Sequence, residues 1–160
     1  MKREIGFTII ELVVVIIVIG ILSVAVFPNM NLMQGFNEAG YKDAIKSGLE
    51  FSRKSAIGQR RNVKVALSNS ALTFTIDNDV LDGASAGTYP RALALPARSL
   101  FCSPGVTNMV CAPSGVALTG TNTIVYTPLG KLSGGAAASY VVSGKASFSV
   151  TVEGETGYVH

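Results

Sequence analysis

The stretch FTIIELVVVIIVIGILSVAVF, from Phe7 to Phe27, decides the fold of this chain. It is apolar almost throughout, and its single charged residue is Glu11. As a helix the stretch would rise about 30 Å, the thickness of the hydrocarbon core of a bilayer, whereas strands rarely exceed about ten residues. The sequence therefore predicts a membrane-spanning helix.

Only six residues precede this stretch, and Lys2 and Arg3 make them basic, which favours the cytoplasmic side of a membrane. A secretory signal would have small residues of the A-x-A type after its apolar run. Here Pro28 and Asn29 follow the run instead, and the small residue in a suitable context is Gly6, before it. Cleavage after Gly6 would leave the whole apolar helix on the mature protein.

The segment Gly6-Phe7-Thr8-Ile9-Ile10-Glu11 resembles the prepilin signature of type IV pilins and type II secretion pseudopilins. The resemblance implies that a prepilin peptidase cuts between Gly6 and Phe7 and methylates the new amine of Phe7. It also makes Glu11 the fifth mature residue. In this family the carboxylate at that position pairs with the N-terminal amine of a neighbouring subunit during assembly.

Physical chemistry agrees with the role that the resemblance gives to Glu11. A carboxylate inside hydrocarbon costs roughly 2.5–3.5 kcal/mol on insertion scales, so such a residue is usually paired or functional. The alternative is a chance acidic residue near a membrane interface. Gly20 and Pro28 add to the resemblance, because they fall where many pilins have a glycine and a proline.

The composition favours a β-rich domain outside the cytoplasm. The 160 residues carry a net charge of +3, and only 14% of them are charged, whereas Gly, Ser, Thr and Ala are abundant. After the apolar helix enough chain remains for one compact domain. A net charge of this size does not argue for a nucleic-acid partner.

Beyond Pro28 the sequence stays helical but becomes amphipathic. Spacings of three and four mark one helix face: Tyr41, Ile45, Leu49, Ser52 and Ala56. Pro28 should kink or loosen the helix, and Gly58 is the expected stop. We therefore expect a leader over 1–6, a transmembrane or filament-core helix over 7–28, an amphipathic half over 29–58 and a β-rich domain over 59–160.

From Arg61 the apolar period changes to two, which is typical of strands. A hairpin is predicted over 62–68 and 71–77, connected by Ser68-Asn69-Ser70. The segment 78–92 is expected to be a loop with a short strand around Val80-Leu81. Further strands are predicted at 115–118, 123–126, 140–142 and 146–152, the last two as a second hairpin. In the segment between the two hairpins, four side chains are expected in the core: Leu93, Leu95, Leu100 and Phe101.

This order resembles the GspH/FimT group of minor pilins and pseudopilins. The resemblance rests on Gly58-Gln59-Arg60-Arg61 directly before a strand, on Thr127–Lys131 and on a closing Thr-Gly. It implies an α+β, pilin-like fold, with one long N-terminal helix packed on an antiparallel β-sheet or β-sandwich. The ending ETGYVH resembles minor pilins of mannose-sensitive haemagglutinin (MSHA) type pili, although a final edge strand would explain it equally well.

Two cysteines, Cys102 and Cys111, enclose a short segment with a Pro-Gly turn. Outside the inner membrane they can form a disulfide, and two partly buried free thiols are the alternative. With His160 they do not make a metal-ligand set. Because His160 is the single histidine, and neither a nucleophile elbow nor a phosphate loop is present, we expect no enzyme and no cofactor.

A basic cluster that includes Arg60, Arg61 and Lys64 follows the predicted helix. One branch of the pilins that this chain resembles binds DNA through a terminal Gly-Arg-x-Arg motif. Here Gly157-Tyr158-Val159-His160 stands in that place, without the two permanent charges that seek phosphate. Contact of the three basic residues with DNA is therefore the lesser hypothesis, because cations are also favourable at a helix C-terminus.

The predicted function is that of a minor pilin or pseudopilin, a single-pass protein of the bacterial inner membrane with a periplasmic domain. It would be built into a type IV pilus or a type II secretion pseudopilus, near the tip or in the initiation complex. Its expected partners are prepilin peptidase, other pilins and the inner-membrane assembly platform. One alternative is a DNA-binding minor pilin for natural transformation. Another is an adhesive tip subunit that uses loop 78–92 or the Cys102–Cys111 loop.

Overall fold

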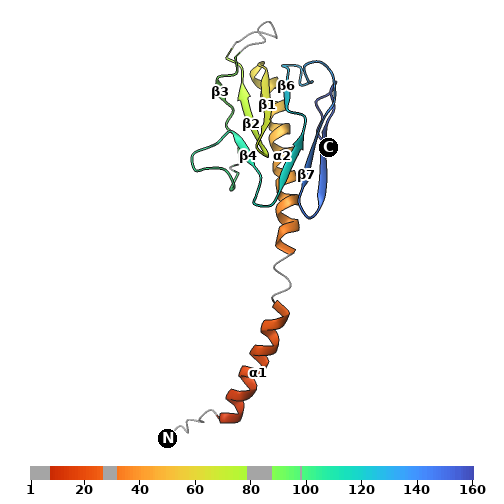
Figure 1. Cartoon of the computed structure of the whole chain (residues 1–160). Helices are drawn as coiled ribbons and strands as arrows, with labels where there is room; N and C mark the ends of the chain where they lie inside the picture. The colour runs from red at the N-terminus through yellow and green to blue at the C-terminus, as the bar shows by residue number, and fades with distance from the viewer. Residues whose placement is uncertain (1–7, 27–31, 79–87, 98) are drawn as a thin grey trace. The chain divides into compact units, whose positions relative to one another are not determined.

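A computed structural model of the chain describes residues 8–26, 32–78, 88–97 and 99–160 (Figure 1). The chain divides into two compact units, residues 1–35 and 36–160, which are treated separately. The predictions for Gly6, Phe7, Pro28 and Val80-Leu81 fall outside the described residues.

The N-terminal unit contains helix α1, Ile9–Val26, which is rich in Ile and Val and apolar on every side. Its described large apolar side chains are between 41% and 84% exposed. Within the described ranges, no helix is both long enough and apolar enough to cross a membrane. The predicted span begins at Phe7 and ends at Phe27, and both residues lie outside those ranges.

Helix α2, Leu32–Gln59, belongs mostly to the second unit. Its predicted apolar face is confirmed, because the five side chains of that face are all buried: Tyr41, Ile45, Leu49, Ser52 and Ala56. This face packs on the sheets, so the amphipathic period of the sequence is explained by the core that it covers.

The prediction that α2 stops at Gly58 is wrong, because the helix runs one residue further. Arg60 takes the left-handed conformation with φ of 51°. Its amide donates to the Ile57 carbonyl at 3.3 Å, and the Arg61 amide donates to the Ala56 carbonyl at 3.1 Å. This pair of hydrogen bonds is a Schellman motif, in which arginine occupies the position that glycine usually takes.

The larger sheet contains β1 (Val63–Ser68), β2 (Ala71–Ile76), β3 (Arg91–Ala92), β4 (Met109–Cys111) and β6 (Thr123–Tyr126), all antiparallel. Strand β1 lies between β2 and β6, and the outer edge of β2 pairs with both β3 and β4. The predicted first hairpin is confirmed. Its two central residues, Asn69 and Ser70, both have positive φ, as a two-residue type I′ turn requires.

The smaller sheet has the order β5 (Ala117–Gly120), β7 (Ala138–Ser143) and β8 (Ser147–Val152). The predicted second hairpin is β7–β8, with six paired positions from Ala138↔Val152 to Ser143↔Ser147. Val159 is buried and bridges Val152, so the closing residues pair along β8. The result is an antiparallel α+β fold with α2 against both sheets, as predicted.

Two of the four side chains expected inside between the hairpins are exposed. Leu93 is buried and Leu95 partly buried, but Leu100 is 90% and Phe101 is 52% exposed. Leu93 and Leu95 lie next to the larger sheet, since their amides donate to the carbonyls of Phe74 and Thr107 at 3.1 and 2.9 Å. Leu100 and Phe101 lie on the loop before Cys102, where an apolar residue type alone does not indicate burial.

A buried carboxylate ties α2 to the second hairpin. Glu38 is only 2% exposed, and it accepts hydrogen bonds from the backbone amides of Lys145 and Ala146, the latter at 2.8 Å. A side chain at Gly144 would overlap the Glu38 carboxylate and would have to displace it from these bonds. The charge-assisted bonds compensate for the burial of the acid.

Three tyrosines are buried, and they differ in the hydrogen bonding of their hydroxyls. The Tyr41 hydroxyl donates to the Ser70 carbonyl at 2.6 Å. Among the described residues, the buried hydroxyls of Tyr126 and Tyr140 have no hydrogen-bond partner. Burial raises the pKa of all three phenols, so they stay neutral at physiological pH.

Candidate assembly site

Glu11 lies in the first turn of α1, where Thr8 begins the helix. The Thr8 carbonyl accepts from the amides of Glu11 at 3.1 Å and Leu12 at 3.3 Å. The Thr8 hydroxyl is 3.4 Å from Glu11 Oε2, to which it donates. This T-x-x-E arrangement resembles a capping box and places a negative charge at the positive end of the helix dipole.

Apart from Thr8, the described side chains around Glu11 are apolar. Its nearest described neighbours along the helix include Ile10, which is 72% exposed, and Leu12, which is 58% exposed. A helix with apolar side chains all round has no face suited to water, so it is typical of segments buried in a membrane or among other helices. Glu11 is the one charged residue of α1.

Gly20 and Ser23 are further interruptions of the apolar surface of α1. A Cβ atom added at Gly20 would meet no atom within 4 Å, so the position is a gap in the side-chain cover. The Ser23 hydroxyl donates to the Ile19 carbonyl at 2.7 Å and is satisfied inside the helix. Gly20 thus offers a place where another backbone can approach closely.

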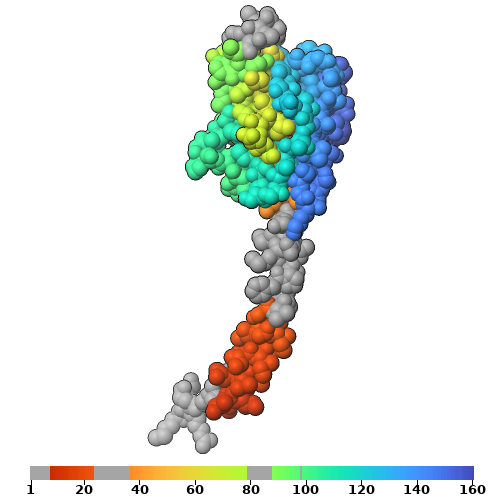
Figure 2. Space-filling view, in the orientation of Figure 1, coloured from red at the N-terminus to blue at the C-terminus, as the bar shows by residue number. Residues whose placement is uncertain are grey.

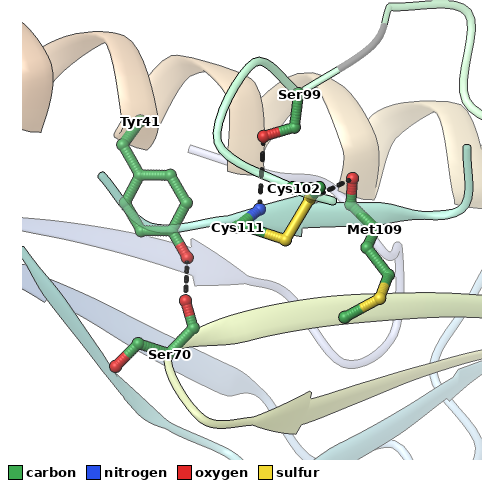
Figure 3. The surroundings of a disulfide bond; sticks show 6 residues. All are labelled: Tyr41, Ser70, Ser99, Cys102, Met109 and Cys111. Carbon is green, nitrogen blue, oxygen red and sulfur yellow. Dashed lines mark hydrogen bonds between the residues drawn. A yellow bond between two sulfur atoms is a disulfide. The ribbon is translucent and has the colours of Figure 1, made fainter. Parts of the chain in front are cut away.

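Cys102 and Cys111 are joined in a disulfide, with their Cα atoms 5.3 Å apart (Figure 3). The Cys111 amide donates to Ser99 Oγ at 3.3 Å, which holds both ends of the loop together. Cys102 Sγ lies 3.5 Å from the Met109 carbonyl. That last approach is a close contact, because a disulfide sulfur has no proton to donate.

Arg61 and Lys64, two of the three basic residues of the predicted cluster, have different partners near the open end of the first hairpin. Arg61 donates to the carbonyls of Asp77 and Asn78, the latter at 2.6 Å, and so closes the open end of the first hairpin. The Lys64 ammonium lies 4.9 Å from the centre of the Tyr89 ring. Burial, and secondarily the Asp77 charge, raises the pKa of that phenol.

Sequence reasoning missed two residues of importance. Thr8 could have been found, since a T-x-x-E spacing before an apolar run is a helix-start signal. Glu38 carried no comparable signal, because its partners lie 107 and 108 residues later. Across the described residues, no group of three or more His, Cys, Asp or Glu side chains could hold a metal ion.

Comparison of the sequence with known protein families gives one match. Residues 1–27 match the family described as the prokaryotic N-terminal methylation motif. The match covers the predicted leader and the apolar stretch that contains α1, and it does not extend to the globular unit. No curated protein is significantly similar to the chain in sequence.

Two solved structures then specify the fold. One is the type IV minor pilin FimU of Pseudomonas aeruginosa, at 10% identity and a TM-score of 0.54 over 76% of this chain and 90% of FimU. The other is the minor pseudopilin EpsH from the type 2 secretion system of Vibrio cholerae, at 11% identity and a TM-score of 0.54 over 78% of this chain and 94% of EpsH. At these identities the likeness shows the fold.

Proposed function

We propose that this chain is a minor pilin or pseudopilin, a structural subunit of a type IV pilus or a type II secretion pseudopilus. The proposal is supported by two observations that occur together in this chain. The methylation motif of residues 1–27 includes an apolar helix with a single charged residue, Glu11, and the chain that follows has the fold seen in a minor pilin and a minor pseudopilin.

In this proposal prepilin peptidase cleaves between Gly6 and Phe7 and methylates the Phe7 amine. Before assembly the residues Phe7–Phe27 anchor the subunit in the inner membrane, with the β-rich unit in the periplasm and Lys2 and Arg3 on the cytoplasmic side. Other pilins and the inner-membrane assembly platform are its partners. Pro28 and Gly20 serve packing of the helix in the filament core.

Glu11 is the proposed assembly residue. Its carboxylate lies on a helix surface that otherwise offers no charge, so an amine of a neighbouring subunit is an effective partner there. The Phe7 amine exists only after cleavage at Gly6. Pairing of the two groups would therefore make assembly depend on processing and would set the register between neighbouring helices.

The test is Glu11→Val in the full chain, expressed in its native host. We expect the variant to enter the membrane as the native chain does, because valine costs less in hydrocarbon than a carboxylate. We expect its recovery in sheared filaments to fall at least tenfold. The measurement is immunoblotting of membrane and filament fractions. Normal recovery of this variant in filaments would overturn the proposal.

A matched control is Thr8→Val, which removes the hydroxyl contact with Glu11 but keeps the carboxylate. If Glu11 acted only as a helix cap, both variants would weaken the helix start by about 1 kcal/mol and would behave alike. The proposal instead expects Thr8→Val to assemble within about twofold of the native chain.

A further inference from the structure

The turn between β7 and β8 presents two adjacent backbone amides to one carboxylate. The Lys145 amide donates to Glu38 Oε1, and the Ala146 amide donates to Glu38 Oε2 at 2.8 Å, so each carboxylate oxygen accepts one hydrogen bond. The Gly144 amide is used within the turn, since it donates to the Ala146 carbonyl at 3.1 Å. Successive amides that point the same way form a concave anion-binding nest. The turn therefore has the donor arrangement of an anion site.

The carboxylate lies beneath the turn and not on its outside. Glu38 is 2% exposed, whereas Gly144, Lys145 and Ala146 are exposed. In Figure 2 the tip of the β7–β8 hairpin, in blue, lies beside the described beginning of α2, in orange. A carboxylate is retained in such a place only where hydrogen bonds replace its contacts with water. Its burial is thus a second indication that the turn suits a carboxylate.

The shape of the turn fits the same group. A Cβ atom added at Gly144 would overlap three atoms of the Glu38 side chain, among them Oε1. The space under the turn is therefore open to a carboxylate because residue 144 has no side chain. Three consecutive residues make the site: Gly144 leaves the space, and Lys145 and Ala146 supply the donors.

Two donors side by side distinguish a carboxylate from its closest neutral analogue. A carboxylate accepts at both oxygens, whereas a glutamine amide accepts at one oxygen and would direct its own N–H group at the second donor. A buried donor without an acceptor costs more free energy than a hydrogen bond contributes on average. The site should therefore reject an amide of the same size.

The same turn of α2 contacts the turns of both hairpins. Glu38 accepts from the β7–β8 turn, and the Tyr41 hydroxyl donates to the Ser70 carbonyl in the turn of the first hairpin. The Lys42 ammonium lies 5.9 Å from the centre of the Phe148 ring on β8. Apolar packing is non-directional and permits a hairpin to shift along a helix, but two hydrogen bonds to one carboxylate do not. Glu38 can therefore specify where the smaller sheet sits on α2.

We propose that the β7–β8 turn is a carboxylate-binding site that the chain fills with its own Glu38, and that this recognition fixes the smaller sheet on α2. With the Glu38 side chain removed, the turn takes a free carboxylate ion from solution. The inference goes beyond the proposed function and does not depend on it, because it concerns the globular unit alone.

The test is Glu38→Ala in the full chain, with acetate as the probe. This change removes one methylene and the carboxylate, a group the size of an acetate ion, and the exposed turn leaves the site open to the solvent. In about 0.5 M sodium chloride near pH 7, we expect the thermal midpoint to fall by at least about 5 °C. In sodium acetate of the same concentration, about half of that loss or more should be recovered by mass action.

Two matched variants separate recognition from packing and from general salt effects. Glu38→Gln fills the same space, so we expect a loss close to that of Glu38→Ala and no recovery in acetate. Glu50→Ala removes a partly exposed carboxylate from the same helix. Its midpoint should change by less than about 2 °C and should gain no more from acetate than that of the native chain. Native stability of Glu38→Gln, or an equal gain from acetate in every variant, would overturn the inference.

Gly144→Ala tests the site from its other side. The added methyl group displaces the carboxylate while Glu38 itself is unchanged. We expect Gly144→Ala to lower the midpoint of the native chain but to cause no further loss in the Glu38→Ala background, because both changes remove the same contact. Losses that add in the double variant would contradict the proposed site, since the glycine would then serve only the backbone of the turn.

Amide hydrogen exchange, followed by mass spectrometry, locates the effect. In Glu38→Ala we expect exchange at Lys145 and Ala146 to accelerate at least tenfold in chloride and to slow again in acetate. The Asn69-Ser70 turn of the first hairpin is the internal reference and should not respond to acetate. Unchanged exchange at Lys145 and Ala146, or an equal response to acetate at the reference turn, would overturn the inference.

Discussion

Helices α1 and α2 belong to one chain but use apolar residues in opposite ways. In α1 the Ile, Val and Leu side chains lie on every side and are largely exposed, for example Ile16 at 59%. In α2 the buried ones lie on one face, where Ile45 and Leu49 are fully buried, and Ile57 is an exception at 43% exposed. The globular unit therefore supplies its own apolar environment, whereas the described apolar surface of α1 is left exposed.

This difference teaches where stability and assembly are encoded. A residue of α1 should contribute little to the folding of the globular unit, because α1 belongs to the other compact unit of the chain. A residue beneath α2 should contribute much. Substitutions at matched positions in the two regions test this difference.

The largest expected effect is that of Phe74→Ala. Phe74 is fully buried, and its ring lies against Gly48 of α2, where an added Cβ would approach within 2.9 Å. Loss of the ring should lower the free energy of unfolding of the globular unit by about 3–5 kcal/mol. The measurement is thermal unfolding of the full chain in detergent, followed by near-ultraviolet circular dichroism.

Ile16→Ala is the comparison for that experiment. Since Ile16 is exposed on α1, we expect the unfolding of the globular unit to change by less than about 0.5 kcal/mol. A loss of stability similar to that of Phe74→Ala would break the contrast between the two regions.

A smaller effect distinguishes the buried tyrosines. Tyr41→Phe removes the hydrogen bond to the Ser70 carbonyl, which should cost about 1 kcal/mol, although that carbonyl keeps the Ala112 amide as a donor at 3.2 Å. Tyr140→Phe removes a buried hydroxyl that has no partner among the described residues, so it should be neutral or stabilising. Chemical denaturation at pH 7 measures both.

The two tyrosine variants control for each other, because each deletes one hydroxyl from a buried ring. A cost for Tyr140→Phe equal to that of Tyr41→Phe would show that the Tyr140 hydroxyl is satisfied in solution. The polar groups buried in the globular unit would then all be hydrogen-bonded at that position.

The smallest expected effect is at the end of α2. Arg60 adopts a left-handed conformation that glycine takes without steric cost, so Arg60→Gly should raise the free energy of unfolding by about 0.5–1 kcal/mol. Gln59→Gly, one residue earlier and still helical, should lower it by a similar amount. Shifts of the same sign in the denaturation midpoint would contradict the helix end described.

The periodic parts of the fold could be predicted from the sequence. Spacing of three and four gave the buried face of α2, and alternation gave both hairpins, because each element repeats its burial within a few residues. The helix end could not be predicted, since Gly58 is a stronger stop signal than Arg60. The helix ends instead where the Arg60 and Arg61 amides donate to the carbonyls of Ile57 and Ala56.

The candidate site was predictable to a smaller extent. Glu11 stands out as a charge in an apolar run, whereas Leu100 and Phe101 looked like core residues. Nothing local distinguishes an apolar pair on a projecting loop from one beneath a sheet, because exposure depends on the loop's distant pairing. The short strands β3 and β4, with two and three residues, were too brief for any period to appear.

The contact of Glu38 with the β7–β8 turn has a mechanical consequence. A tension applied along the backbone from the N-terminal side enters the globular unit near Glu38. The carboxylate joins this point to residues 107 and 108 positions later. The pull is therefore divided between the helix and a hairpin of the smaller sheet, so the turns of α2 that follow Glu38 are held by those two bonds until they rupture.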